Sequence, residues 1–312
     1  MLDRATRLIF ALVVIASLSA CANLKAVRDF TATSAQLTGY TDVTNRYISG
    51  PARVTPQIPE GVDFDAERAQ IQKLDVATKA QKDSLVKIHN VVTGYMAALA
   101  QLAGDDTFSI SPQIDKVTGA IVAAPSLGLN SDHVRAFGMI ASKVSSWILA
   151  AKQAKEVKSM VNEHGQSMDK MLEAMGLVTT AMKVQLDVER GKIKSYHDTH
   201  LANFLVPVGS ERPAPVGLSD AAKKQYDADR QVLIQRRQAE IVWANRGYTS
   251  IQADEDAAVE SASAIIEGVK VVRKGHEDMR QNIDKLSSDD VKGLLQKATD
   301  DLRTIRDNLK KL

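Results

Sequence analysis

The chain has 312 residues and a nearly balanced charge, with 40 basic and 38 acidic side chains and a formal net charge of +2. This balance excludes the strongly basic surface that nucleic-acid binding requires, so we expect no nucleic-acid partner. Aromatic residues make up only 4% of the chain, and glycine and proline are sparse. Such a composition is typical of long amphipathic helices and argues against a β-rich fold.

The amino terminus carries the most specific signal in the sequence. Arg4 and Arg7 precede an unbroken apolar run from Leu8 to Ala16, and the only cysteine follows at Cys21. The run is too short to span a bilayer, because a spanning helix needs roughly 20 apolar residues. Its position behind two basic residues is typical of a cleaved export signal.

The segment Leu18-Ser19-Ala20-Cys21 resembles the lipobox of bacterial lipoproteins. The resemblance implies that residues 1–20 are removed as a signal peptide and that Cys21 carries covalent lipid, such as palmitate, as a membrane anchor. Because Ala22 and not aspartate follows the cysteine, it also implies delivery to the outer membrane, facing the periplasm. The alternatives are an ordinary secretory signal peptide and an uncleaved anchor with an incidental thiol.

Apolar residues beyond position 22 recur at intervals of three and four, which predicts amphipathic helices. We expect helices over 23–49, 63–104, 131–205, 219–247, 249–286 and 287–312, with loops near 50–62, 105–130 and 207–218. Proline clusters mark the first and third loops. Each helix is apolar on one side only, so each must pack on another. The predicted fold is all-α, an elongated antiparallel bundle of long, coiled-coil-like helices that forms one body over residues 21–312.

Local signals refine this prediction. Ser131, Ser219 and the run 287–290 are expected to begin helices, since serine and aspartate cap helix starts. Residues 131–205 are predicted to form one rod of about 110 Å. Gly247 is predicted to end a helix or mark a hinge. Within the seam over 71–102, Thr78 and Gln81 interrupt the apolar pattern, so the facing helix should place small or polar groups opposite them.

Methionine and histidine provide the candidate metal ligands. Five methionines lie between residues 160 and 182, and thioethers with imidazole suit Cu(I). The same spacing continues an aliphatic seam, so we interpret these methionines as core packing. Two histidines three residues apart do not make a zinc site, which needs about four ligands. We therefore predict no metal and no cofactor, and the low-probability candidates are His164, Met168, Met171, Met175, His197 and His200.

Other features give no catalytic signal. The sequence has no glycine-rich phosphate loop, paired-cysteine motif or nucleophile elbow, so we predict that the protein is not an enzyme. Trp147 and Trp243 are interpreted as core anchors. The apolar stretch 117–125 is expected to form a short helix against the bundle, or else a hydrophobic tongue offered to a partner or bilayer.

These observations favour a lipid-anchored envelope protein that acts as a non-enzymatic helical scaffold or protein-interaction module. Its expected partners are the membrane, through the lipid on Cys21, and other envelope proteins, and a homo-oligomer stays open. The first alternative is a helical bundle that binds a soft metal or a small apolar ligand. The second is a membrane-active protein with the architecture of α-helical pore formers.

Overall fold

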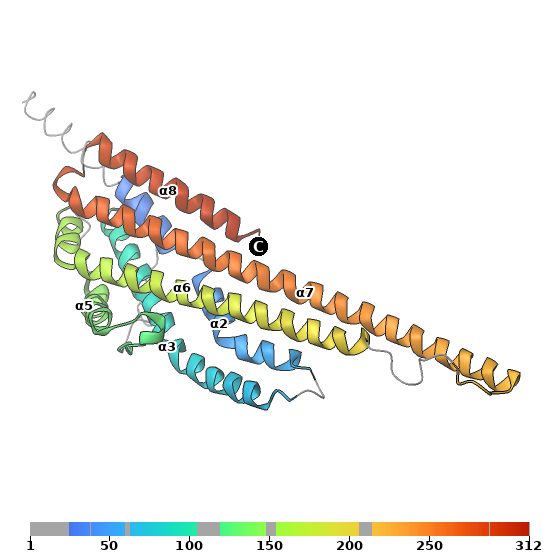
Figure 1. The fold of residues 1–312 in the computed structure, drawn as a ribbon. Coiled ribbons are helices and arrows are strands. Elements are labelled where there is room, and N and C mark those ends of the chain that lie inside the picture. The colour runs from blue at the N-terminus through green and yellow to red at the C-terminus, as the bar shows by residue number, and fades with distance from the viewer. Residues whose placement is uncertain are drawn as a thin grey trace, which may run out of the picture. The chain divides into compact units, whose positions relative to one another are not determined.

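The computed structural model describes residues 25–37, 39–59, 63–104, 119–147, 154–205, 214–286 and 288–311. The side chains of 145–147, 154–155 and 203–205 also lie outside this description. Over the described residues the fold is an all-α helical bundle (Figure 1), as predicted. The only β-type pairing there is an isolated bridge between Ala124 and Leu129.

The helical elements of the described residues are as follows, in chain order. After a first helical segment over residues 25–35 come α2 (Tyr40–Val54), the 3-10 turn η1 (Thr55–Gln57), α3 (Asp65–Leu102), η2 (Pro125–Leu127), α5 (Ser131–Trp147), α6 (Ala154–Leu205), α7 (Asp220–Gln281), η4 (Ile283–Lys285) and α8 (Asp289–Leu309). Among the described helices, none combines the length and the apolar character that crossing a bilayer requires.

The chain divides into two compact units. Unit 1 takes in the described parts of 1–48, 77–184 and 260–312, and unit 2 those of 49–76 and 185–259. Unit 1 therefore contains the first helical segment, α5, α8 and parts of the longer helices. Unit 2 contains the end of α2, the start of α3 and the facing parts of α6 and α7.

Helix α3 forms the centre of unit 1. Residues 91–100 are buried on every side, so the seam predicted for one face becomes a fully enclosed helix there. Before that stretch the predicted register is confirmed, with Leu85 fully buried and Lys82 exposed. Packing of helices around α3 thus provides the hydrophobic core of unit 1, in a chain that has few aromatic residues.

The polar interruptions in the α3 seam are matched by α2. The Tyr47 hydroxyl donates to Gln81 Oε1 at 3.0 Å, and Thr78 Oγ1 donates to the Ile48 carbonyl at 3.5 Å. A buried polar group without a partner costs free energy, and these contacts avoid that cost. The prediction that the facing helix places polar groups here is confirmed.

The prediction of one helix over 23–49 is wrong, because the chain turns between the first segment and α2. Gly39 adopts a φ of 88°, a left-handed conformation that glycine takes at helix ends without steric strain. The turn lets the first segment pack on α7. There a Cβ at Gly275 would lie 2.5 Å from the Phe30 ring, so only glycine permits this approach.

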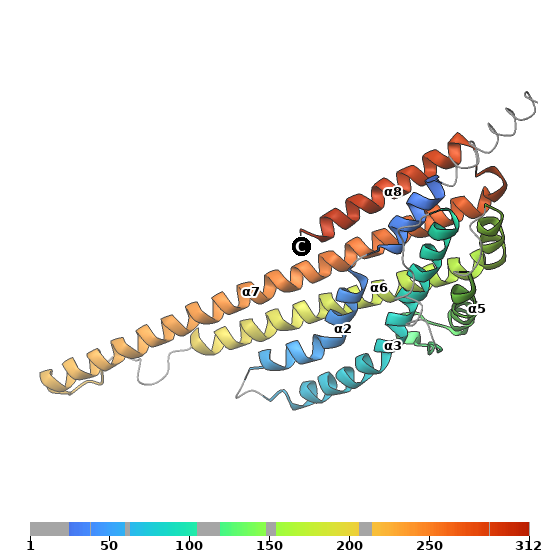
Figure 2. The ribbon, with the colours of Figure 1, turned by 180° about the vertical axis from the view of Figure 1, so that it is seen from behind.

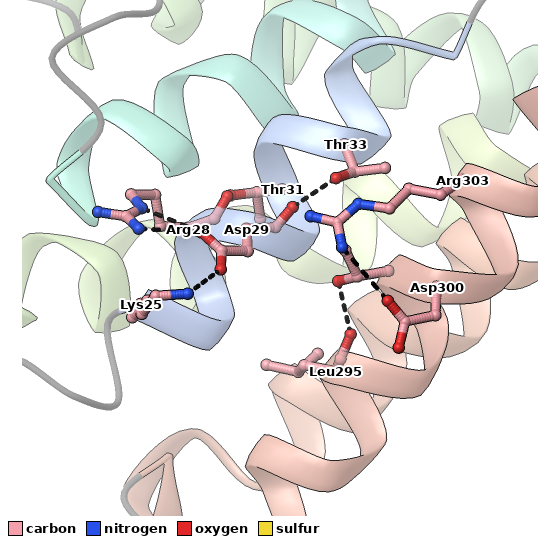
Figure 3. A network of polar contacts seen from close by, with 9 residues as sticks. Lys25, Arg28, Asp29, Thr31, Thr33, Leu295, Asp300 and Arg303 are labelled. Carbon is pink, nitrogen blue, oxygen red and sulfur yellow. Dashed lines mark hydrogen bonds and ion pairs between the residues drawn. The ribbon is translucent and has the colours of Figure 1, made fainter.

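The first segment also lies beside α8. Its Lys25 Nζ donates to Asp29 Oδ2 at 2.6 Å and its Arg28 Nη2 to Asp29 Oδ1 at 3.0 Å, while Arg303 on α8 donates to Asp300 (Figure 3). Partial burial would raise the pKa of Asp29, but the hydrogen bonds from the two cations outweigh it and lower the pKa. Lys25, Arg28 and Arg303 are thus each paired within their own helix, while Arg306 Nη1 on α8 donates to Gln36 Oε1 of the first segment at 3.3 Å.

The prediction of one rod over 131–205 is wrong, because this part of the chain forms two helices, α5 and α6. Ser167 Oγ on α6 donates to Met139 Sδ on α5 at 3.6 Å. In one straight helix these residues would lie about 42 Å apart. The chain therefore folds back, and α5 also packs on α3, where a Cβ at Gly94 would lie 3.3 Å from Val144. No glycine or proline marks this reversal in the sequence, so the periodicity of apolar residues alone could not predict it.

The cap of α5 lies one residue earlier than predicted. The Asn130 side chain accepts from the backbone N–H groups of Asp132 at 3.0 Å and His133 at 3.2 Å. In return the buried His133 accepts from the Asn130 N–H through Nδ1 at 3.2 Å. This is a capping box in which histidine takes the place of glutamate, so Asn130 and not Ser131 is the N-cap of α5. Ser219 and Ser288 cap α7 and α8 as predicted.

The apolar stretch 117–125 does not form the predicted helix over its described residues, 119–125, while residues 117 and 118 lie outside the description. Residues 120–124 are not helical, and a single 3-10 turn follows at η2. Ile121, Leu127 and Leu129 are buried. The Val122 N–H donates to Ser84 Oγ at 3.2 Å, which ties the segment to α3. Within the described part of the stretch Ile121 is thus buried against unit 1, whereas Val122 is 72% exposed.

A buried polar chain links three helices inside unit 1. The Tyr95 hydroxyl on α3 lies 3.1 Å from His276 Nε2 on α7, and His276 Nδ1 lies 2.8 Å from Asp169 Oδ1 on α6. Arg280 Nε adds an ion pair to Asp169 at 3.1 Å. Tyr95 and His276 are completely buried. Their role is to align the three helices, because any slip would leave these groups unpaired.

We predict that His89 makes stability depend on pH. The ring is stacked on Tyr40 with centroids 5.1 Å apart, and burial lowers its pKa to about 4. As the pH falls from 6.5 toward 4, the unfolded chain takes up a proton that the folded chain does not. The free energy of unfolding should therefore fall by up to about 3 kcal/mol.

Urea unfolding of His89→Phe across this range checks the prediction. Phenylalanine keeps a ring against Tyr40 but cannot titrate, so the variant should lose most of the dependence. His200→Phe is the matched control, because His200 is exposed. The assignment is wrong if both variants retain the slope of the native protein.

Candidate functional site

Unit 2 is built where α6 and α7 run antiparallel. Arg190 Nη1 on α6 donates to Asp256 Oδ1 on α7 at 2.9 Å, and further along α6 His197 stacks on Tyr248 with ring centroids 4.0 Å apart. Residue numbers rise along α6 as they fall along α7, which is the pattern of antiparallel pairing. Figures 1 and 2 show the two helices side by side.

Helix α7 is continuous through this region, which corrects the break predicted at Gly247. The helix extends from Asp220 to Gln281 without interruption. Glycine inside a helix costs only about 1 kcal/mol relative to alanine, less than packing can supply. Thr249 does not cap a new helix, since its hydroxyl donates back to the Asn245 carbonyl at 2.9 Å.

An ionic cluster holds the end of α2 in place. Arg53 Nε and Nη2 each donate to one carboxylate oxygen of Glu189, both at 2.9 Å, and Glu255 Oε1 lies 3.6 Å from the same guanidinium. A Cβ at Gly50 would lie 2.7 Å from Glu189 Oε2, so a larger side chain there would displace this carboxylate. This bidentate pair explains why α2 continues past Pro51, where the sequence predicted a stop near Gly50.

An apolar cluster forms the base of the candidate site. Phe64 meets the Tyr196 ring edge-on, with centroids 5.6 Å apart. Burial, together with the nearby Glu67 carboxylate, raises the pKa of Tyr196, so its phenol stays neutral in the physiological range. The buried members of the cluster are Val54, Ile58, Ile71, Ile193 and Tyr196, and the half-buried ones are Phe64, Tyr248 and Ile251.

Above this base lies an open groove of about 500 Å³. None of its lining residues carries a carboxylate, ammonium or guanidinium group, although charged residues make up 25% of the chain. Rings dominate the lining, and the polar side-chain groups are an amide, two imidazoles, an indole N–H and the tyrosine hydroxyls. The lining consists of Pro56, Gln57, Ile58, Pro59, Tyr196, His197, His200, Trp243, Ala244, Gly247, Tyr248 and Ile251.

One face of α7 forms a wall of this groove. Two large rings, Trp243 and Tyr248, alternate there with two small residues, Ala244 and Gly247, and Ile251 follows one turn later. Nothing lies within 4 Å of a Cβ built at Gly247, so the space between the rings is open. The helix thus presents a notch with an aromatic ring on either side, which suits a ring or branched aliphatic group of a binding partner.

Trp243 corrects a sequence prediction. It was expected to anchor the core, but 80% of its surface is exposed. The spacing of apolar residues along α7 is compatible with a core position for Trp243. Whether that side of the helix is buried depends, however, on where α6 lies. The side chain of Trp147 lies outside the described residues. An exposed tryptophan beside an uncharged groove is typical of a binding surface.

The candidate metal ligands fall into two separate groups. His197 and His200 belong to the groove of unit 2, whereas His164 and the methionines belong to α6 in unit 1. Burial lowers the pKa of His164. In the described part of the chain, no three His, Cys, Asp or Glu side chains are grouped so that they could hold a metal. The predicted absence of a metal stays a prediction. Core packing of the methionines is supported by complete burial of Met168, Met171 and Met175.

Two further points concern the sequence predictions. Cys21, the predicted lipidation site, lies outside the described residues. The groove itself was not foreseen, because its prolines, Pro56 and Pro59, come from a loop far in sequence from α6 and α7. The available signal was the local concentration of rings at residues 196–200 and 243–248 in a chain poor in aromatic residues.

Comparison with known proteins adds no relative: no family model, curated protein or solved structure matches this chain.

We predict that the methionines act through packing and not through their sulfur atoms. Changing Met168, Met171 and Met175 together to Leu keeps volume and apolarity, so each substitution should change the free energy of unfolding by less than about 1.5 kcal/mol. Anaerobic titration should find negligible Cu(I) affinity before and after the change. Tight Cu(I) binding by the native protein, lost in the triple variant, would reverse this interpretation.

Proposed function

We propose that this protein is a lipid-anchored envelope protein that acts as a non-enzymatic interaction module, and that the groove of unit 2 is its docking site. The observation that carries the docking role is the uncharged, ring-lined groove with Trp243 exposed at its edge. The anchor rests on the lipobox resemblance at Cys21. Delivery to the outer membrane, facing the periplasm, is part of the same proposal.

The groove favours a protein segment over a small molecule. Pockets for small ligands enclose most of the ligand surface, whereas this groove is open and leaves Trp243 mostly exposed. Tyrosine and tryptophan also dominate the binding energy of protein interfaces. Because the lining has no carboxylate, ammonium or guanidinium group, it favours a segment with few charged side chains.

A small apolar ligand is the second candidate for the same groove. Its volume of about 500 Å³ lies within the range of small-molecule sites. The membrane-active alternative has less support, because Ile121, Leu127 and Leu129 are buried and would have to leave unit 1 to enter lipid.

The first prediction concerns the anchor. Cys21→Ser removes the thiol that accepts the lipid, so the variant should no longer be processed as a lipoprotein or labelled by radioactive palmitate in bacterial cells. Cys21 precedes the first helical segment, so helix content by circular dichroism should not change. Palmitate labelling that persists in the variant would refute the anchor.

The second prediction concerns the groove. A photoreactive amino acid at His200, at the exposed end of the lining, should give a protein-sized adduct on irradiation of intact cells. The same residue placed at the exposed Lys297 of unit 1 is the matched control and should give none. Trp243→Ala should abolish the adduct while changing the free energy of unfolding by no more than about 0.5 kcal/mol, because the side chain is exposed.

The outcomes separate the candidates. An adduct that grows only by the mass of a small molecule favours the ligand-binding alternative. Equal adducts at His200 and Lys297, or none at either position, would refute the docking role.

A further inference from the structure

The amino-terminal part of α7 extends beyond α6. Arg190 pairs with Asp256 and His197 with Tyr248, and continuing this antiparallel register brings the end of α6, Leu205, to about residue 240 of α7. Roughly 20 residues of α7, or about 30 Å, therefore lie past the end of α6. From residue 220 to residue 254 of α7, no residue is buried.

One side of this exposed part of α7 bears apolar groups. Val232 and Val242 are 59% and 50% exposed, and Ala228 and Ala239 are exposed beside them. The spacing of three, four and seven residues places these side chains on one face of the helix, which the exposed Gln235 shares. We call this face the α7 stripe. A face of this kind is the surface with which a helix packs on another helix.

The edge of the α7 stripe is complementary to itself. Ala222, Asp229, Arg236 and Trp243 follow one another at intervals of seven residues and are all exposed. Seven residues are nearly two full turns, so the four form one column along the helix. When two such columns are aligned antiparallel, the tryptophan of each lies opposite the alanine of the other, and the arginine of each lies opposite the aspartate of the other. No two like charges meet.

We propose that the occupant of the groove is a second copy of this chain. The two α7 helices pair antiparallel about a two-fold axis between Val232 and Leu233. Asp229 of each copy then faces Arg236 of the other, and Trp243 of each copy packs over Ala222 of the other. The proposal rests on the proposed function, because it names the protein partner of the same groove.

This register also supplies a segment for the groove. Val216, Gly217 and Leu218 precede α7 and are uncharged, and both apolar side chains are exposed. Leu218 lies four residues before Ala222, and Gly247 lies four residues after Trp243. Leu218 of one copy is therefore brought to the notch at Gly247 of the other, where an uncharged segment meets an uncharged lining.

A copy cannot fill its own groove in this way. Roughly 24 residues of continuous helix separate Ser219 from Trp243, which holds the segment before α7 about 36 Å from the groove of the same chain. Because each copy gives one segment and receives one, the contact is isologous and closes as a dimer.

A cysteine at the axis tests the proposal in the membrane-anchored protein. If Cys21 is lipidated, Val232→Cys provides the only free thiol, and the two thiols of a dimer lie close enough to be oxidised by diamide to an interchain disulfide. Gln238→Cys is the matched control. Gln238 is exposed on another side of α7, and in the dimer its two copies lie roughly 16 Å apart along the helices. We expect a disulfide-linked dimer from position 232 and none from position 238.

Charge reversal tests the register independently. Asp229→Arg or Arg236→Asp alone opposes like charges at two places in the dimer, so each should raise the dissociation constant about tenfold in sedimentation equilibrium. The double variant restores the pairing in reversed order and should recover most of the affinity. Neither residue lines the groove.

The outcomes distinguish the two proposals. If position 232 gives no disulfide and the protein sediments as a monomer, but His200 still cross-links to another protein, the second copy is wrong and the docking role stands. If the cross-link from His200 is absent as well, both the second copy and the docking role are refuted. Reversals that weaken the dimer without rescue by the double variant would refute the antiparallel register.

Discussion

One-sided helices are the constraint on which the structure depends. With few aromatic residues, the chain must bury small aliphatic surfaces, and a helix that is apolar on one side can do so only against another helix. Unit 1 satisfies this requirement around α3, where residues 91–100 are enclosed. In unit 2 the amino-terminal part of α7 extends beyond α6, and much of the α7 stripe lies on that extension, whereas the groove lies where α6 and α7 run side by side.

Buried polar groups add specificity to this packing. Apolar seams with similar spacing allow helices to slide by one turn at little cost, whereas polar pairs do not. The contact of Tyr95 with His276 and of His276 with Asp169 is made in one alignment only, and Arg53 with Glu189 has the same effect at the end of α2. Such pairs contribute little net stability, because burying charge is costly, but they exclude alternative registers.

The sequence was informative where local chemistry decides the structure. The α3 seam, the serine caps of α7 and α8, and the polar groups opposite Thr78 and Gln81 all follow from spacing and hydrogen-bonding needs. Prediction from the sequence failed where tertiary contacts decide the structure, as in the reversal between α5 and α6. Gly247 shows the same limit, because packing outweighs the small cost of a glycine within a helix. Trp243 lies on a face whose cover depends on the end of α6, which the periodicity of α7 cannot indicate.

Lipid anchoring and self-pairing would reinforce each other. Two chains held on one membrane meet at a high effective concentration, so a stripe of modest apolar area can pair there even if it is weak in solution. A dimer would in turn carry two lipid anchors, and two anchors hold a protein to a bilayer far more firmly than one. On this argument the small side chains of the α7 stripe suit a contact formed after delivery to the membrane.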